Sequence, residues 1–80
     1  MKAHVWVLPK ATVLDPQGQA VERALRSLGF DAVRSVRQGK LFVVELNGVA
    51  REEAARQVDE MARRLLANPV IEDYRIELLD

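Results

Sequence analysis

Two segments of this 80-residue chain carry apolar residues at helical spacing on one side only, and this pattern restricts the possible folds most strongly. The first runs from about Pro16 to Leu28, and the second from about Arg51 to Ala67. A helix of this kind has to bury its apolar stripe against another element. The stripes consist of Val21, Ala24, Leu25 and Leu28 in the first segment, and of Ala54, Val58, Met61 and Leu65 in the second.

The first of these helices has clear start and stop signals. Asp15 supplies an N-cap acceptor, and Pro16 at the first helical position has no N–H group to leave unsatisfied. Gly29 is placed to end the helix in a left-handed turn. Gly18, inside the first turn, is unexpected because glycine weakens a helix.

Extended segments alternate with the helices. Residues Lys2–Leu8 are apolar on both faces, which predicts a central strand or one covered by another subunit. A second extended region spans residues 32–46, and the last one spans residues 70–79. Gly39 lies either in a tight turn between two antiparallel strands or in a bulge of one long bent strand. The apolar alternation keeps its phase through Gly39, which favours the second alternative.

The order β-α-β(β)-α-β predicts a single α+β domain over residues 1–80. Both apolar stripes are buried if the two helices lie side by side on one face of an antiparallel sheet. This plan is related to the ferredoxin-like fold.

Composition argues against several classes of function. The chain has 12 basic and 12 acidic residues, which argues against nucleic-acid binding, and it has no cysteine and only one histidine for metal ligation. No apolar run is long enough to span a membrane, and no signal peptide is recognisable, so we expect a cytoplasmic protein. Small domains without disulfides commonly gain stability by forming oligomers.

No pattern of reactive residues is present. His4 lies in a predicted strand without a nucleophile near it, and Glu72 and Asp73 point to opposite faces of another strand. "VRQGK", with Arg37 and Lys40 beside a glycine, is either an anion site or a solvated turn or bulge. Trp6 and Phe42 indicate a sheet face packed on another sheet face more than a base-stacking platform. We therefore expect no catalytic, cofactor-binding or metal-binding residue.

Three blocks of sequence resemble one known family: "VLDPQGQAVERALRSLGF", "VRSVRQGK" and "LLANPVIEDYRIE". The chain is similar to the PurS-type small subunit of phosphoribosylformylglycinamidine synthase over nearly its whole length. The resemblance implies a non-catalytic accessory subunit of de novo purine synthesis, forming a homodimer or a tetramer. It implies a large synthetase subunit that binds ATP, Mg²⁺ and formylglycinamide ribonucleotide (FGAR), and a glutaminase subunit that supplies ammonia.

The same blocks provide candidate residues for contact with other subunits. We expect Gly18 to let the Asp15–Gln19 turn approach another chain closely; in the alternative it packs against its own sheet or faces solvent. The candidates are Asp15, Gln17, Gly18, Arg37, Lys40, Asn68, Glu72 and Tyr74.

A regulatory module similar in plan to ACT domains is the alternative of a different class. Such a module would bind a small effector at a glycine-bearing loop that enters the first helix, a role open to "DPQG".

Overall fold

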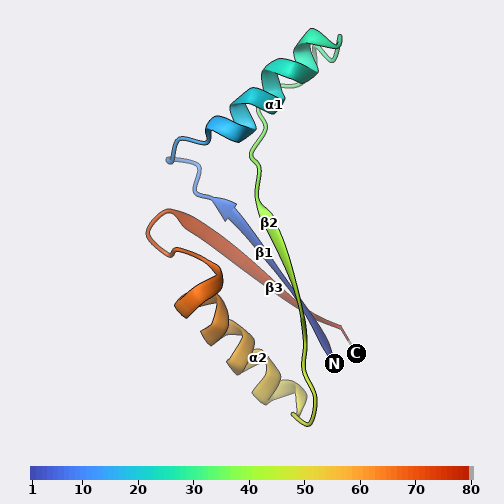
Figure 1. Cartoon of the computed structure of the whole chain (residues 1–80), viewed down its shortest axis with the longest axis vertical. Coiled ribbons are helices and arrows are strands. Elements are labelled where there is room, and N and C mark those ends of the chain that lie inside the picture. The colour runs from blue at the N-terminus through green and yellow to red at the C-terminus, as the bar shows by residue number, and fades with distance from the viewer. Residues whose placement is uncertain (80) are drawn as a thin grey trace.

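β1 is the central strand of a three-stranded antiparallel sheet in the order β2-β1-β3 (Figure 1). The computed structural model describes residues 1–79. Its elements are β1 (Lys2–Pro9), α1 (Pro16–Ser27), β2 (Lys40–Glu45), α2 (Arg51–Met61), the π-helical turn η1 (Ala62–Leu66) and β3 (Glu72–Leu79). The antiparallel α+β class with two helices and the central position of the first strand are thereby confirmed.

The register of the sheet separates one buried face from one open face. β1 pairs with β2 from Lys2↔Glu45 to Val7↔Lys40, and with β3 from Lys2↔Leu79 to Pro9↔Glu72. Because side chains alternate along a strand, Ala3, Val5 and Val7 share one face, and all three are fully buried.

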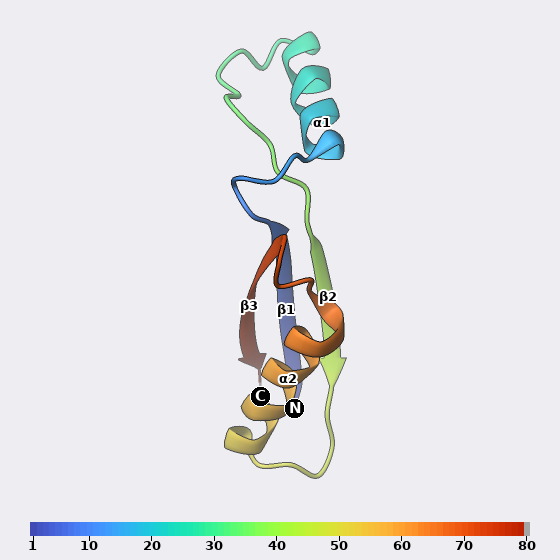
Figure 2. The same cartoon turned by 90° about the vertical axis from the view of Figure 1, so that its left-hand side faces the viewer.

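α2 covers this buried face (Figure 2). Val58 and Ala62 pack against the β1 side chains, and Phe42, Val44 and Ile76 close the edges of the core. The π-helical turn ends α2 with a bond from the Ala67 N–H to the Ala62 carbonyl. Leu65, predicted to lie on the buried stripe, is instead 83% exposed, because the wider turn changes the helical phase that the prediction assumed.

The placement predicted for the first helix is wrong. α1 lies beyond the end of the sheet and away from α2, not beside it (Figures 1 and 2). The reason is that residues 36–39 extend β2 in a straight line past the end of the sheet, so that α1, which precedes them, lies beyond the sheet. The helix itself forms as predicted, with Asp15 as its N-cap and Gly29 at a φ of 99° after its end.

No hairpin forms at Gly39, but the long bent strand that the alternation favoured does not form either, because β2 begins only at Lys40 and residues 33–39 belong to no strand. A side chain at Gly39 would collide with the carbonyl oxygen of Val7 and with the Leu8 side chain. Glycine is needed here because the two backbones approach each other closely.

Residues 10–39, called the arm below, make the molecule elongated. Its dimensions are 49 × 26 × 14 Å and its radius of gyration is 15.9 Å, whereas a compact chain of this length has about 12 Å. Within residues 1–79 no helix has the length and apolar character needed to cross a membrane.

Candidate interaction site

Seven of the eight predicted contact residues gather where the arm leaves the sheet. We call this region the junction; it contains Asp15, Gln17, Gly18, Arg37, Lys40, Asn68 and Glu72. The chain thus brings together residues from all three sequence blocks. Whether they contact other subunits stays a prediction.

The Asp15 carboxylate fixes the start of α1. Its Oδ1 atom accepts a 3.0 Å hydrogen bond from the Gly18 N–H, and its Oδ2 atom accepts a 2.9 Å bond from the Gln38 N–H. The Gln38 side-chain amide also donates to the Gln17 side-chain oxygen at 3.1 Å. Bonds from the Gly18 and Gln38 N–H groups stabilise the charged form and hold the pKa of Asp15 below its usual value.

Gly18 is explained by a contact within its own chain. A Cβ atom there would collide with the Asp15 carboxylate and with the carbonyl oxygen of Val36. The close neighbour that we expected from another subunit is therefore supplied by the returning segment of the arm. The Gly18 N–H is also occupied by Asp15, so it is not free for an effector as the ACT-like alternative requires.

A second group of bonds ties β3 to the turn before it and to β2. The Asn68 N–H donates to Glu72 Oε1 at 2.7 Å, and the Asn68 side-chain oxygen accepts from the Val70 N–H at 3.0 Å. The other carboxylate oxygen of Glu72 lies 3.7 Å from Lys40 Nζ. Arg37 completes the junction, because its Nη1 atom donates to the Pro9 carbonyl at 3.1 Å.

Tyr74, the eighth candidate, belongs to the contact between β3 and α2. Its hydroxyl donates a 2.6 Å hydrogen bond to Asp59 Oδ1, and Arg63 Nε donates to Asp59 Oδ2 at 2.8 Å. The Tyr74 and Arg63 bonds lower the pKa of Asp59, and the same Asp59 bond raises the pKa of Tyr74. These hydrogen bonds join β3 to α2 and so stabilise the fold.

Residues 1–79 contain no group of three or more histidine or acidic residues that could hold a metal ion. Two exposed apolar surfaces stand out, and our candidate list contains neither.

The first is the arm surface, formed by Val21, Leu25, Leu28 and Phe30; Leu28 is 74% exposed. The second is the open face of the sheet, opposite α2, where Trp6, Leu8, Leu41 and Val43 are exposed. The signal for the open face was present in the sequence, because the first strand is apolar on both sides. The arm surface was missed because its stripe was assigned to the core.

The solvent-accessible area supports the view that these surfaces are covered in the working protein. The chain exposes 5865 Å², whereas a folded monomer of this mass exposes about 4,900 Å². The excess of about 1,000 Å² is comparable with the roughly 800 Å² that each partner buries in a stable interface.

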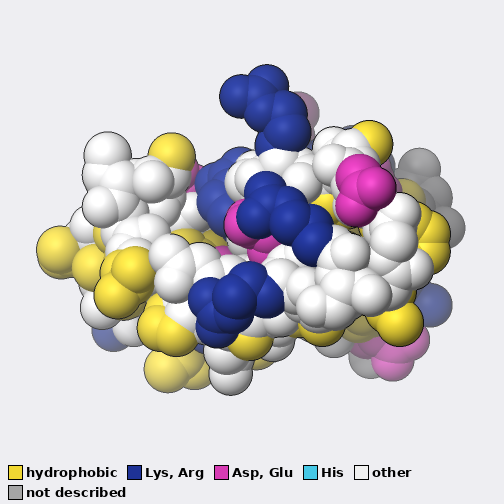
Figure 3. All heavy atoms as spheres, turned by 90° about the horizontal axis from the view of Figure 1, so that it is seen from above, with side chains coloured by type: hydrophobic (Ala, Val, Ile, Leu, Met, Phe, Trp, Pro, Cys, Tyr) yellow, Lys and Arg dark blue, Asp and Glu magenta, His cyan; other side chains and the backbone are white. Residues whose placement is uncertain are grey.

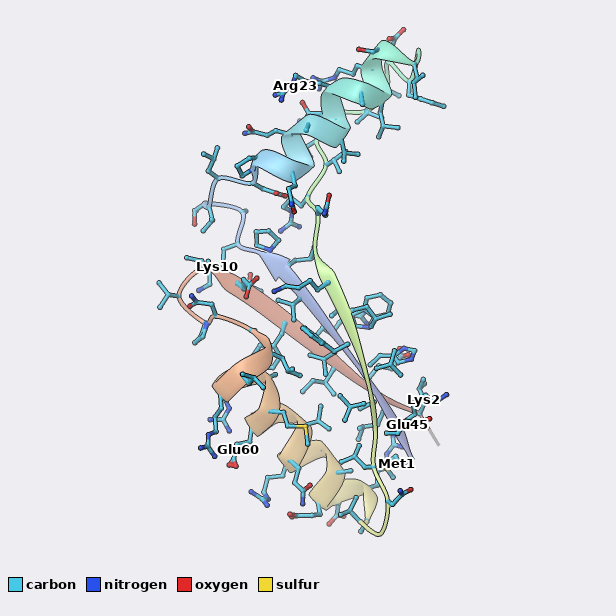
Figure 4. All side chains as sticks on the ribbon, viewed as in Figure 1. Met1, Lys2, Lys10, Arg23, Glu45 and Glu60 are labelled. Atoms are coloured by element: carbon cyan, nitrogen blue, oxygen red, sulfur yellow. The ribbon has the colours of Figure 1, made fainter. Side chains whose placement is uncertain are left out.

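Basic side chains gather on the arm. Figure 3, which looks down on α1, shows Lys and Arg side chains next to hydrophobic ones. Figure 4 shows Arg23 on α1, far from Lys2 and Glu45 at the other end of the sheet. The arm has five basic and three acidic residues, so it is the cationic part of a neutral chain.

Comparison with known proteins gives consistent matches. A family model described as "PurS: Phosphoribosylformylglycinamidine (FGAM) synthase" matches residues 2–80. The PurS subunit of Archaeoglobus fulgidus is 46% identical over 76 residues, covering 95% of each chain. The Bacillus subtilis PurS structure has a TM-score of 0.84 at 44% identity, covering 99% of this chain and 98% of that one. A chain of the Thermotoga maritima PurLQS structure has a TM-score of 0.88 at 33% identity, covering 98% and 95%.

Proposed function

This chain belongs to the PurS family, and from that membership we propose that it is a non-catalytic adaptor within phosphoribosylformylglycinamidine synthase. PurS is a subunit of this synthase complex together with PurL and PurQ, in purine biosynthesis. The adaptor bridges the glutaminase and the large synthetase subunits, so that ammonia from glutamine is used in the ATP-dependent conversion of FGAR to FGAM. The match over residues 2–80 to a family of synthase subunits carries this proposal.

The adaptor acts as a homodimer built through the arm surface. Leu28 and Phe30 are too exposed for a monomer of this size, and the excess accessible area is about that of one interface. The sequence predicts a layer of two helices on the sheet, and α1 of one copy can supply the second helix to its partner. The open face then remains for other contacts, and a tetramer would have to use it.

ATP and Mg²⁺ bind to the large synthetase subunit in this proposal, and this chain binds no cofactor. The assembly works in the cytoplasm. The chain contributes placement, since it holds two active sites in one complex and so raises the effective concentration of each for the other.

Reconstitution of FGAR amidation tests the adaptor role. Purified synthetase and glutaminase subunits are assayed with and without this chain, using either glutamine or free ammonia as the nitrogen donor. We expect this chain to raise the glutamine-dependent rate strongly and the ammonia-dependent rate little. If neither rate responds, the adaptor role is wrong.

A further inference from the structure

The open face contains a hollow of about 540 Å³ at the end nearest the arm. Its apolar lining comes from Trp6 and Leu8 on β1 and from Leu41 on β2. Arg37, Asp73 and Arg75 also line it. The register explains the arrangement, because Trp6 is paired with both Leu41 and Arg75, and Leu8 with Asp73.

The two arginines of the hollow have unused hydrogen-bond donors. The Arg75 guanidinium lies 5.4 Å from the centre of the Trp6 ring, a cation–π contact that holds it in place. Arg37 uses one N–H group for the Pro9 carbonyl. Neither arginine forms a salt bridge with any carboxylate in the described part of the chain. Each guanidinium has five donors, in a planar fork that matches a carboxylate.

The charge around the hollow is positive. Arg37 and Arg75 face one acidic residue, Asp73, while Lys40 is directed to Glu72. An apolar floor with two preplaced guanidinium groups suits a carboxylate carried on an apolar body. The exposed apolar surface also continues from Leu41 to Val43 along β2, beyond the hollow. A polypeptide segment fits such a strip better than a small molecule does.

We propose that this hollow binds a segment of one of the two larger synthase subunits, in which an acidic side chain is flanked by apolar residues. The inference rests on the proposed adaptor function for the source of the segment. The carboxylate binds between Arg37 and Arg75, and the apolar neighbours cover Trp6 and Leu41. A second copy stacked face to face in the same direction would bring its Arg37 and Arg75 against those of the first copy, so like charges would repel. A copy turned end for end would place its Glu45 and Glu77 near these arginines, and the measurement of self-association below tests that occupant.

The test compares charge reversal at the two ends of the open face. The single variant Arg75→Glu and the double variant Arg37→Glu/Arg75→Glu are compared with the control Lys2→Glu, which changes the net charge by the same amount as Arg75→Glu and lies at the far end of the same face (Figure 4). The dissociation constant for each larger subunit is measured at two salt concentrations, together with the melting temperature and the oligomeric state by sedimentation. If Arg75→Glu unfolds the protein, Arg75→Lys keeps the charge but removes the planar fork.

We expect the double variant to bind one of the two larger subunits at least about tenfold more weakly, with a reduced salt dependence. The control should stay within about twofold of the wild type, with the dimer intact in both. An equal loss in the control would show general electrostatics and would overturn the inference. So would a change in self-association with unchanged binding of the larger subunits, because the open face would then be a contact between copies.

A second experiment tests whether the hollow binds small anions. Succinate and adenosine monophosphate are added to the wild type and to the double variant, and the melting temperature is followed. A saturable stabilisation that the double variant loses would assign the hollow to a small ligand and overturn the inference. If the wild type binds neither larger subunit, the proposed function itself fails; if all variants bind normally, only this inference fails.

Discussion

Asp15 and Gln38 are 23 residues apart in the sequence, yet Oδ2 of Asp15 accepts a 2.9 Å hydrogen bond from the backbone N–H of Gln38. The other oxygen of the same carboxylate caps α1 through Gly18. One side chain therefore joins the outgoing and the returning ends of the arm. This bond fixes the direction in which α1 extends from the sheet.

Replacing Asp15 should loosen the arm in two steps. Asp15→Asn keeps a good N-cap but has only one acceptor oxygen, so it loses one of the two bonds. Asp15→Ala loses both. We expect melting temperatures in the order wild type, Asn variant, Ala variant, measured by circular dichroism at one protein concentration. Asp31→Ala, in the exposed turn after α1, is the control and should change little.

The pH dependence of this effect has a defined sign. Because the pKa of Asp15 is lowered by folding, its charged form contributes stability above its unfolded pKa of about 3.9. That contribution is lost as the pH falls through the lower folded pKa. The difference in melting temperature between wild type and Asp15→Asn should therefore shrink in acid; a difference that is constant down to low pH would contradict this account.

Gly18→Ala should be harmful, although alanine is the better helix former. The added Cβ has to displace either the Asp15 carboxylate or the backbone at Val36. We expect a loss of about 1–3 kcal/mol in the free energy of unfolding, as for other overpacked sites, measured by urea unfolding. Gln19→Ala, at the next and exposed position of α1, should be neutral or slightly stabilising. If both variants are equally stable, the space around Gly18 is less restricted than the structure indicates.

The sequence predicted the elements of this fold better than their placement. Capping residues and periodicity are local signals, so the limits of α1 and its left-handed end at Gly29 were predictable. The position of α1 depends on where residues 36–39 lead after the helix, and an amphipathic stripe does not state which chain buries it. The prediction assumed burial within one chain, whereas Leu28 is exposed.

For the candidate site too, the sequence predicted the residues involved better than their neighbours in space. Seven of the eight predicted residues come together at the junction, but the close neighbour of Gly18 is a carbonyl group of its own chain. The glycine indicates that another group approaches closely, but residue types do not say which chain supplies that group. Trp6 and Leu8 in the first strand made the apolar open face predictable, but its arginines come from other segments: the strand register places Arg75, and the segment before β2 places Arg37.

Tyr74→Phe should remove a bond between β3 and α2 without leaving a hole. The hydroxyl donates to Asp59 at 2.6 Å in a half-buried position, and we expect a loss of about 1 kcal/mol in the free energy of unfolding at neutral pH. Urea unfolding of Tyr74→Phe, Asp59→Ala and the double variant measures the coupling between the two residues. Strictly additive effects would show that the bond contributes nothing.

The same bond predicts an alkaline effect. Folding raises the pKa of Tyr74 because its hydroxyl donates to Asp59, so its contribution is complete below the unfolded pKa of about 10 and is lost as the pH rises through the folded pKa. The wild type should therefore lose its advantage over Tyr74→Phe in strongly alkaline solution. An advantage that grows with pH would contradict the assignment of the hydrogen bond.

Leu28→Asp should break the proposed dimer while leaving the fold of the sheet and α2 intact. Leu28 is 74% exposed in the single chain, so the change costs the monomer little, but a carboxylate buried without a partner is strongly unfavourable in an apolar interface. We expect the dimer dissociation constant, measured by sedimentation equilibrium, to rise by at least about 100-fold, which corresponds to about 2.7 kcal/mol. Gln19→Asp is the matched control, because helical spacing puts residue 19 on the opposite side of α1 from Leu28. If Leu28→Asp remains dimeric and Trp6→Asp becomes monomeric, the copies associate through the open face and the arm surface is free for the larger subunits.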